Sequence, residues 1–351
     1  MDFGLFVPCH RFDASVGTKE LYDQALDMVR FADEAGFTTA WFPEHHLVQY
    51  ISSPSPLMWM VKAAAATRRI RVGAAILVIP YYNPLRLAGE IGMADVLCDG
   101  RLEIGVGRGA FEYEFDRFGI TEAIGAARLR EGMEIVEGLL TQDDFSYEGT
   151  TCSFGPATAV PKPLQQPHPP IWVAARSPDT IAWALRRGYN LLTTPWRDPF
   201  SRIQKHHEQV AQIAAAVGVT RPPTLAVSRM TYVGKTDGDA LDAMGDIQVN
   251  HRIFTRLFRN QATVKGGYTL PEPVDDEYSR EQLLANLVAG SPETCVEKVR
   301  AYEALGINQF ILYGAFGPDH SRTMASLRRF AEQVMPVIRS SPASWPSPRT
   351  P

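Results

Sequence analysis

The sequence predicts an α/β protein of the (β/α)8 TIM-barrel class. Its length supports this, because 351 residues lie within the range that such barrels occupy as one domain. Near-continuous apolar runs, typical of parallel strands covered on both faces, alternate with segments of helical periodicity. Eight such runs can be placed along the chain, and four strand–helix units occur in the first 109 residues.

The first half of the chain contains four expected strands, at 3–7, 37–42, 70–79 and 101–109. Three expected helices separate them, at 18–35, 54–67 and 84–98. Thr18 is suited to cap the first helix and Gly36 to end it, because a left-handed residue commonly terminates a helix. Pro84 is suited to open the third helix, and Asp99–Gly100 to end it.

The second half contains two expected insertions into the barrel. The first, after strand four, covers 111–170 and holds a helix at 126–140 and a polar stretch at 145–154 that is expected to leave the barrel. Strands five to eight are expected at 171–175, 191–194, 225–233 and 309–313, with a helix directly after Asp179. The second insertion, 266–280, lies between strands seven and eight. Its lack of periodicity predicts a mobile lid or, alternatively, a surface insertion.

These boundaries predict one barrel domain over 1–339 and a Pro-rich tail over 340–351, whose composition does not favour a packed element. A net charge of −4 gives no electrostatic footprint for nucleic acid or an anionic membrane. The amino-terminal residues lack the basic and long apolar regions of a signal peptide. We therefore expect a cytoplasmic protein with a small-molecule partner and four free cysteine thiols.

The stretch Trp41–His46 places Glu44, His45 and His46 where the second strand ends. Ligands of barrel enzymes gather at the carboxyl ends of the strands, and histidine has a pKa near neutrality, so general acid or base work is expected. Neighbouring strand residues face opposite sides, which favours one inward histidine. A metal site and a structural pair of hydrogen-bonded histidines remain alternatives, although adjacent histidines lack the usual ligand spacing.

Two further segments have the chemistry of an anion site. Arg108 stands among the glycines that end strand four, and Arg176–Ser177 follows strand five at the start of a helix. Guanidinium groups pair with phosphate, and the first turn of a helix offers free N–H groups, so both segments are expected to converge on one phosphate. A tight turn with a solvated arginine and an ordinary serine cap explain the same residues.

Aromatic residues after strands three and six, Tyr81, Tyr82 and Trp196, could line a pocket for a flat heterocycle or an organic substrate. Aromatic side chains are also common in ordinary cores, and that interpretation is preferred for Trp59.

Six short segments are specific when their order and spacing are taken together: Met1–Phe6, Trp41–His46, Val72–Ile76, Gly100–Gly109, Gly290–Glu293 and Glu332–Pro336. Together they resemble the bacterial luciferase-like family of flavin-dependent monooxygenases over nearly the whole chain. The resemblance implies that His45, next to Glu44, is the catalytic imidazole beside the flavin.

The resemblance also implies a set of cofactor contacts. Arg108 and Ser177 would hold the FMN phosphate, with Arg128 as a third contact. Ala75–Ile76 falls where the family has a non-prolyl cis peptide under the flavin ring. Arg176 and Trp196 complete the expected cofactor-binding residues.

In such enzymes reduced FMN reacts with O2 to give a C4a-hydroperoxide, which inserts one oxygen atom into an organic substrate. The resemblance therefore implies a two-component FMNH2-dependent monooxygenase with an apolar or aromatic substrate. No nicotinamide fingerprint is found, so a separate NAD(P)H:flavin reductase is expected, and the family suggests a homodimer. A deazaflavin-dependent hydride transfer and a non-catalytic flavin-binding subunit remain alternatives.

One residue departs from the family pattern. Gly107 stands where the catalytic chain of luciferase has a reactive cysteine. Light emission is therefore not expected.

Overall fold

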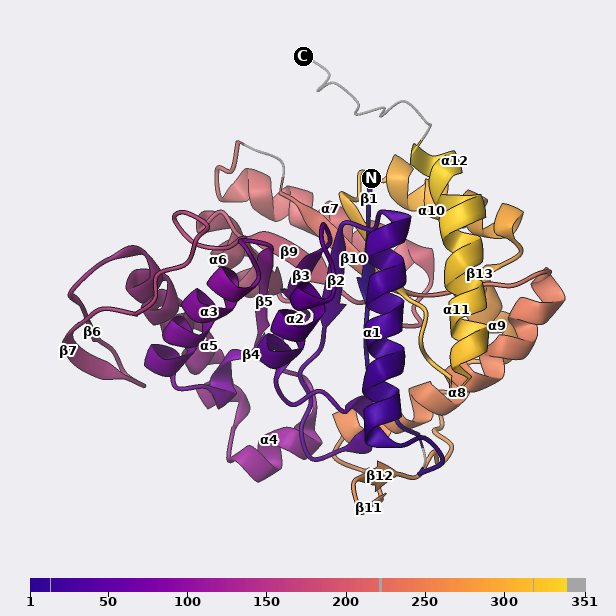
Figure 1. The fold of residues 1–351 in the computed structure, drawn as a ribbon, viewed down its shortest axis with the longest axis horizontal. Helices are drawn as coiled ribbons and strands as arrows, with labels where there is room; N and C mark the ends of the chain where they lie inside the picture. The colour runs from indigo at the N-terminus through magenta and orange to yellow at the C-terminus, as the bar shows by residue number, and fades with distance from the viewer. Residues whose placement is uncertain (13, 221–222, 318, 340–351) are drawn as a thin grey trace. The chain divides into compact units, whose positions relative to one another are not determined.

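The computed structural model describes residues 1–351 apart from 13, 221–222, 318 and 340–351, so the expected tail lies outside the described residues. The fold is the (β/α)8 barrel that the sequence predicts (Figure 1). Its strands, in chain order, are β1 (Asp2–Phe6), β2 (Thr39–Phe42), β3 (Arg71–Ala74), β5 (Leu102–Gly107), β8 (Ile171–Ala174), β9 (Asn190–Thr193), β10 (Leu225–Val233) and β14 (Gln309–Tyr313).

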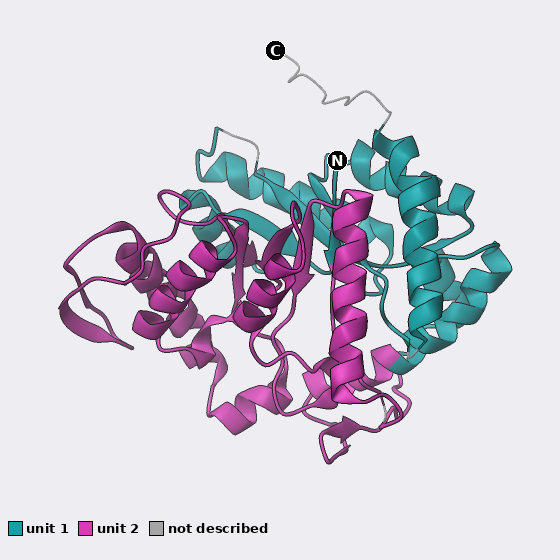
Figure 2. Ribbon diagram, in the orientation of Figure 1, with its two compact units in different colours: residues 1–5, 175–249, 276–351 teal, residues 6–174, 250–275 magenta. Residues whose placement is uncertain are grey.

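The chain divides into two compact units (Figure 2). Unit 1 comprises 1–5, 175–249 and 276–351, and unit 2 comprises 6–174 and 250–275.

In unit 2, strands β2, β3, β5 and β8 pair in parallel in that order. Three long helices of this unit are α1 (Thr18–Ala35), α2 (Pro56–Ala65) and α3 (Pro84–Leu97). The apolar positions of α1 are buried at helical spacing, and Gly36, with φ of 83°, ends the helix as expected. Trp41 is fully buried, and a side chain at Gly73 would meet its ring at 2.5 Å, so close strand packing requires glycine there.

The third strand differs from the expected continuous run over 70–79. It stops at Ala74, resumes as the short strand β4 (Leu77–Val78) and passes into the 3-10 helix η2 (Ile79–Tyr81). The Val78 amide donates to the Glu44 carboxylate at 2.7 Å. The Glu44 carboxylate, which follows β2, thus bonds to the short strand β4, in a region where the apolar pattern alone predicts one uninterrupted strand.

The insertion after strand four holds two helices rather than one. The first, α4 (Glu112–Phe118), was not expected, and the second, α5 (Glu122–Thr141), begins four residues before the expected 126 because Thr121 caps it through the Ile124 amide. The polar stretch forms the antiparallel hairpin β6 (Phe145–Glu148) and β7 (Ser153–Ala157). Its aromatic side chains Phe145, Tyr147 and Phe154 pack against the buried cluster of Ala88, Ile135, Leu139 and Ala159.

The second expected insertion begins in another short hairpin of unit 2. Strands β11 (Val264–Lys265) and β12 (Tyr268–Thr269) flank Gly266–Gly267, and the Gly267 carbonyl accepts from the Gln49 amide of η1 (Gln49–Ile51) at 2.7 Å. The hairpin therefore lies directly beside the loop that follows His46. Its role as a lid stays a prediction.

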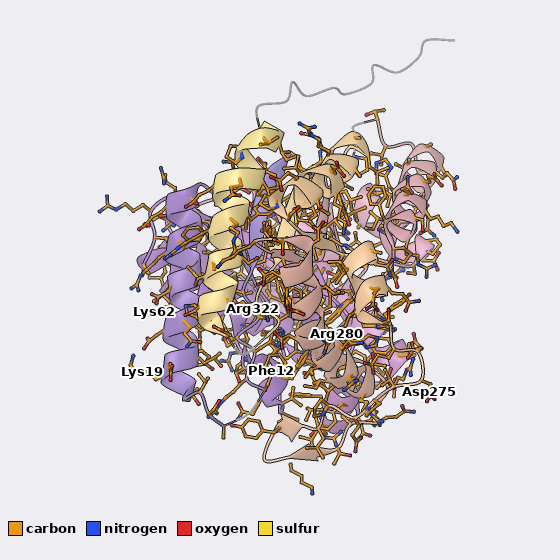
Figure 3. The ribbon with its side chains drawn as sticks, turned by 90° about the vertical axis from the view of Figure 1, so that its right-hand side faces the viewer. Phe12, Lys19, Lys62, Asp275, Arg280 and Arg322 are labelled. Carbon is orange, nitrogen blue, oxygen red and sulfur yellow. The ribbon has the colours of Figure 1, made fainter. Side chains whose placement is uncertain are left out.

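In unit 1, strands β9, β10, β14 and β1 pair in parallel, and the additional strand β13 (Val288–Gly290) pairs with the far end of β10. The helices that begin in this unit are α6 (Pro178–Arg186), α7 (Phe200–Ala216), α8 (Asp237–Phe258), α9 (Arg280–Asn286), α10 (Pro292–Ala304), α11 (His320–Arg329), the π-helix η3 (Phe330–Val334) and α12 (Met335–Arg339). Arg322 of α11, labelled in Figure 3, donates to the Tyr232 hydroxyl at 2.9 Å and lies 3.7 Å from a carboxylate oxygen of Asp246. These contacts tie α11 to β10 and α8.

Candidate active site

His45 is held in a defined orientation beyond the end of β2. Its ring stacks on Phe111 with 4.1 Å between centroids, and its Nδ1 lies 3.0 Å from Glu114 Oε1. A carboxylate can only accept from this nitrogen, so Nδ1 carries a proton. In the neutral ring Nε2 is then the basic nitrogen, and it has no hydrogen-bond partner among the described residues.

Glu114 organises this end of unit 2. The side chain is almost fully buried, and it also accepts from the backbone amide of His46 at 2.8 Å and faces the Tyr81 hydroxyl at 3.5 Å. The sequence gives no signal for this pair, because Glu114 lies on the unexpected helix α4, 69 residues from His45. No local pattern marks such a long-range pair.

Glu44, expected to be catalytic, has both carboxylate oxygens engaged. Oε1 accepts from His46 Nε2 at 2.8 Å, and Oε2 accepts from the Val78 amide at 2.7 Å. Burial raises the pKa of Glu44 above its usual value, against the lowering effect of hydrogen bonds from His46, Val78 and Tyr82. The carboxylate therefore braces the loop around His45 in this structure, and direct participation of Glu44 in chemistry stays a prediction.

His10 is a second histidine in this part of unit 2, and the sequence offered no partner for it. Its Nδ1 donates to the Tyr50 carbonyl at 2.5 Å, and its Nε2 accepts from the Asn250 amide nitrogen at 3.1 Å. The Tyr50 hydroxyl completes the network by donating to Asn250 Oδ1 at 2.9 Å. Burial lowers the pKa of His10 to about 3, so this ring is neutral at physiological pH.

The Ala75–Ile76 peptide bond is cis, as the family resemblance implies. The side chain of Ile76 also explains the departure at Gly107, because a Cβ added there would lie 2.3 Å from Ile76 Cδ1. A cysteine at this position would require Ile76 to move.

The two arginines expected at the cofactor phosphate both lie against α5. Arg108 donates to Glu122 Oε1 at 2.6 Å, and its chain passes close to Gly125, where a Cβ would be 3.1 Å from Arg108 Cγ. Arg128, one turn further along the helix, donates to the Pro80 carbonyl at 3.2 Å. Unit 2 thus holds both expected guanidinium groups against α5.

The remaining expected residues lie in unit 1, in the chain segments that follow β8 and β9. Ser177 caps α6 by accepting from the Thr180 amide at 3.3 Å, and Pro178 occupies the first helical position. Arg176 donates to the Thr194 carbonyl at 3.3 Å. Trp196 has a positive φ of 49° and meets the ring of Tyr313 edge to face at 6.0 Å.

Arg229 supports the Trp196 loop and was not singled out in the sequence. It is fully buried in β10 and donates to the carbonyls of Trp196, Asp198 and Asn286 at 2.6–2.9 Å. Its position inside an apolar strand concealed this role, because the partners are backbone groups distant in sequence.

The structure therefore gathers the expected residues in two groups. Unit 2 holds Glu44, His45, Ala75, Ile76, Arg108 and Arg128, and unit 1 holds Arg176, Ser177 and Trp196. Within the described ranges no three or more His, Cys, Asp or Glu side chains form a group that could hold a metal ion. No helix in the described part of the chain has both the length and the apolar character needed to cross a membrane.

A (β/α)8 barrel with a carboxylate-held imidazole beyond a strand end has the architecture of an enzyme site. The chain belongs to the luciferase-like monooxygenase family, whose pattern matches residues 1–309. This membership confirms the resemblance drawn from the sequence and the expectation of an enzyme, an oxidoreductase of the luciferase-like class.

Three known proteins illustrate the relationship. The chain is 31% identical over 350 residues to the oxygenase component of the flavin-dependent trigonelline monooxygenase of Acinetobacter baylyi, covering 97% of this chain and 96% of that protein. It is similar to the crystal structure of the monooxygenase RslO1 from Streptomyces bottropensis, with a TM-score of 0.83, 26% identity, and 96% and 100% of the two chains covered. The oxygenating constituent of 3,6-diketocamphane monooxygenase from Pseudomonas putida, solved in complex with FMN, shares the fold at a TM-score of 0.78, with 22% identity and 96% and 98% covered.

Proposed function

We propose that this chain is the oxygenase component of a two-component monooxygenase that uses reduced FMN and O2 to insert one oxygen atom into an apolar or aromatic organic substrate. The observation that carries the proposal is the His45–Glu114 pair, which leaves a basic Nε2 for a bound ligand. The similarity to the oxygenase component of a flavin-dependent enzyme supports it and favours a separate reductase as the source of reduced flavin.

The donor groups of the chain fit an FMN phosphate. Arg108 and Arg128 offer guanidinium groups along α5, and Ser177 offers a hydroxyl at the start of the nine-residue helix α6, with Arg176 preceding it. Charged donors and a helix start are the usual partners of a phosphate. We assign Arg108, Arg128 and Ser177 to the phosphate and keep Arg176 among the cofactor-binding residues.

The flavin ring is assigned to Ala75–Ile76 and Trp196. When bound, the flavin supplies the activation of dioxygen, which no amino-acid side chain can provide. His45 holds or transfers a proton through Nε2, while Glu114 fixes the orientation of its ring. Phe111 covers one face of the imidazole and excludes water from that face.

The aromatic side chains of unit 2 support an apolar or aromatic substrate. Phe111 lies edge to face with Phe254 at 5.2 Å and near Tyr50 at 6.4 Å. His46 meets the rings of Tyr81 and Phe118. These rings give the imidazole surroundings of low polarity, which favour an apolar or aromatic substrate.

The assembly and location predicted from the sequence are also part of the proposal. We infer a homodimer that pairs through α2 and α3, because four large apolar side chains of these helices are exposed: Met58, Met93, Val96 and Leu97. The cytoplasmic location and the single domain over 1–339 are retained from the sequence.

Anaerobic titration with FMNH2, followed by mixing with 18O2 and either trigonelline or a panel of aromatic heterocycles, tests the proposed reaction. One labelled oxygen atom per product, detected by mass spectrometry, is expected. Substrate reduction by a reduced deazaflavin without O2 uptake would instead identify the hydride-transfer alternative. Tight FMNH2 binding with no product across the panel would identify the non-catalytic subunit.

A further inference from the structure

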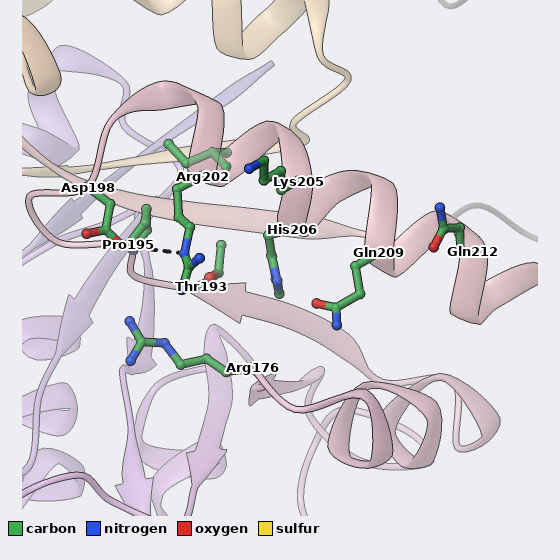
Figure 4. A pocket seen from close by; sticks show the side chains of 10 residues that line it. Arg176, Thr193, Pro195, Asp198, Arg202, Lys205, His206, Gln209 and Gln212 are labelled. Carbon is green, nitrogen blue, oxygen red and sulfur yellow. Dashed lines mark ion pairs between the residues drawn. The ribbon is translucent and has the colours of Figure 1, made fainter.

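A basic pocket of about 720 Å³ lies within unit 1, beside the end of β9 and helix α7 (Figure 4). Arg176 follows β8, and Thr193 is the last residue of β9. Helix α7 provides Arg202, Lys205 and His206 along the same wall. In Figure 4, Arg202 and His206 point from α7 toward the level of Thr193, and Arg176 extends into the same space from the other side.

The charges that line this pocket are unbalanced. Arg176, Arg202 and Lys205 face one carboxylate, Asp198, whose oxygen lies 3.8 Å from Arg202 Nε. The Arg202 side chain is 71% exposed, and such an exposed ion pair contributes little to stability. Lys205 has no ion-pair partner among the residues that the structure describes. The cationic groups of Arg202 and Lys205 are therefore available to a ligand.

His206 supplies a second, independent observation. Its Nε2 is buried and lacks a hydrogen-bond partner within the described ranges, although the ring borders the pocket. An unsatisfied buried polar atom is costly, and a ligand oxygen or hydroxyl would relieve that cost. Burial lowers the pKa of His206, and the nearby Arg176 contributes to this lowering.

We propose that this pocket binds a small molecule that carries a phosphate group, held by Arg202, Lys205 and His206 of α7 with Arg176 opposite. A guanidinium and an ammonium group carry two positive charges. They therefore match a phosphate dianion better than they match a ligand with a single carboxylate. The pocket falls within the size range of small-molecule sites and exceeds what inorganic phosphate alone would fill.

The proposal goes beyond the proposed oxygenase function. The cofactor phosphate is assigned to Arg108, Arg128 and the start of α6, and none of the three α7 residues belongs to that group. Arg176 is common to the two groups, because it precedes Ser177 and also lines the pocket. Because Arg202, Lys205 and His206 are not assigned to the cofactor, they are expected to hold the ligand while FMN is bound.

Isothermal titration calorimetry of the full chain with pyrophosphate, at constant ionic strength and with saturating FMN, tests the proposal. Saturable binding of one pyrophosphate per chain is expected. The double variant Arg202→Gln with Lys205→Gln should weaken it at least tenfold, and His206→Ala should weaken it several-fold. The matched control, Arg186→Gln with Lys235→Gln, removes one arginine and one lysine charge outside the pocket. It should leave pyrophosphate binding unchanged.

Four outcomes would overturn the proposal: no saturable binding to the wild-type chain, loss of binding when FMN is added, equal weakening in the control variant, or tighter binding of citrate than of pyrophosphate. FMN affinity is measured separately by fluorescence quenching in the same samples. A protein that binds pyrophosphate but not FMN would contradict only the proposed cofactor, and the reverse result would contradict only this pocket.

Discussion

At the residue scale, the imidazole of His45 depends on a partner that fixes its proton. Glu114 accepts from Nδ1, and the stacked ring of Phe111 restricts rotation. Glu44 and His46 form a second carboxylate–imidazole pair beside the first, with the carboxylate also bonded to the Val78 amide. Two adjacent histidines thus have different surroundings: His45 is held through Nδ1, which leaves Nε2 as the basic nitrogen, whereas His46 is held through Nε2.

Replacing His45 by Gln is expected to lower kcat for oxygenation about 100-fold or more, with FMNH2 affinity changed less than threefold. The reason is that Gln keeps much of the volume but cannot exchange a proton. Glu114→Gln preserves shape and removes the charge, and should lower kcat about tenfold with little change in KM. Single-turnover kinetics and calorimetry measure these effects.

The exposed Glu112 of the same helix provides the control, since Glu112→Gln removes the same charge without contacting His45. If Glu114→Gln behaves like Glu112→Gln, Glu114 does not position the imidazole. If His45→Gln retains full turnover, the catalytic assignment of His45 is wrong.

Arg108 carries an ion pair that must open for it to bind a phosphate. Its partner Glu122 is mostly exposed, so the pair itself contributes little to stability. Glu122→Gln is therefore expected to raise FMN affinity two- to tenfold, whereas Arg108→Gln should lower it at least tenfold but leave riboflavin binding unchanged. Fluorescence titration with both flavins measures this. Equal losses for FMN and riboflavin in Arg108→Gln would contradict a phosphate contact.

At the scale of elements, the strands could be predicted because each buried strand is an apolar run of characteristic length. Strand β10 lies exactly over 225–233, as expected. The elements that carry the site are harder to predict from the sequence. Helix α4 is only seven residues long, and it buries Glu114 together with Tyr113 and Phe115. Nothing near Glu114 in the sequence indicates that its partner is His45.

The same limit applies to the interrupted third strand and to His10. An apolar run over 70–79 reads as one strand, but the strand stops at Ala74 and resumes at Leu77, and the Val78 amide donates to Glu44, 34 residues earlier. Asn250 lies 240 residues from His10. Apolar periodicity is local, whereas polar pairing is set by the fold, so the barrel could be predicted more completely than its hydrogen bonds.

The junction between α1 and β3 depends on Asp33. Its carboxylate accepts from the amides of Arg68, Arg69 and Ile70 at 2.7–3.0 Å. Burial tends to raise the pKa of Asp33, but these bonds outweigh it and the pKa is lowered. The bonds therefore stabilise the fold above the unfolded pKa near 4, and this contribution is lost as pH falls through the lower folded pKa.

Asp33→Asn is accordingly expected to lower the free energy of unfolding by about 1–3 kcal/mol at pH 7. The difference from the wild-type protein should shrink as the pH approaches 2. Urea unfolding followed by circular dichroism at several pH values measures it. The exposed Asp27 of the same helix gives the control, and a wild-type-to-Asn difference that is independent of pH would contradict the carboxylate's role.

At the scale of the whole molecule, the proposed dimer depends on an apolar surface that a monomer would leave in water. Met58 of α2 is 75% exposed, and Met93 and Leu97 of α3 are 55% and 48% exposed. Helices α2 and α3 pack against each other within unit 2, so these side chains belong to neighbouring helices. Methionine adapts its shape to a partner surface, which suits a helical interface.

Analytical ultracentrifugation of the wild-type chain is expected to give twice the mass of one chain, and the double variant Met58→Glu with Met93→Glu to give a monomer. Charges placed in the centre of an apolar interface would be buried without partners, which weakens association by at least 100-fold. Val337→Glu, on the exposed side of α12 in unit 1, controls for the added charge and should stay dimeric. A wild-type monomer, or a dimer that survives both α2–α3 substitutions, would assign the exposed methionines to another role.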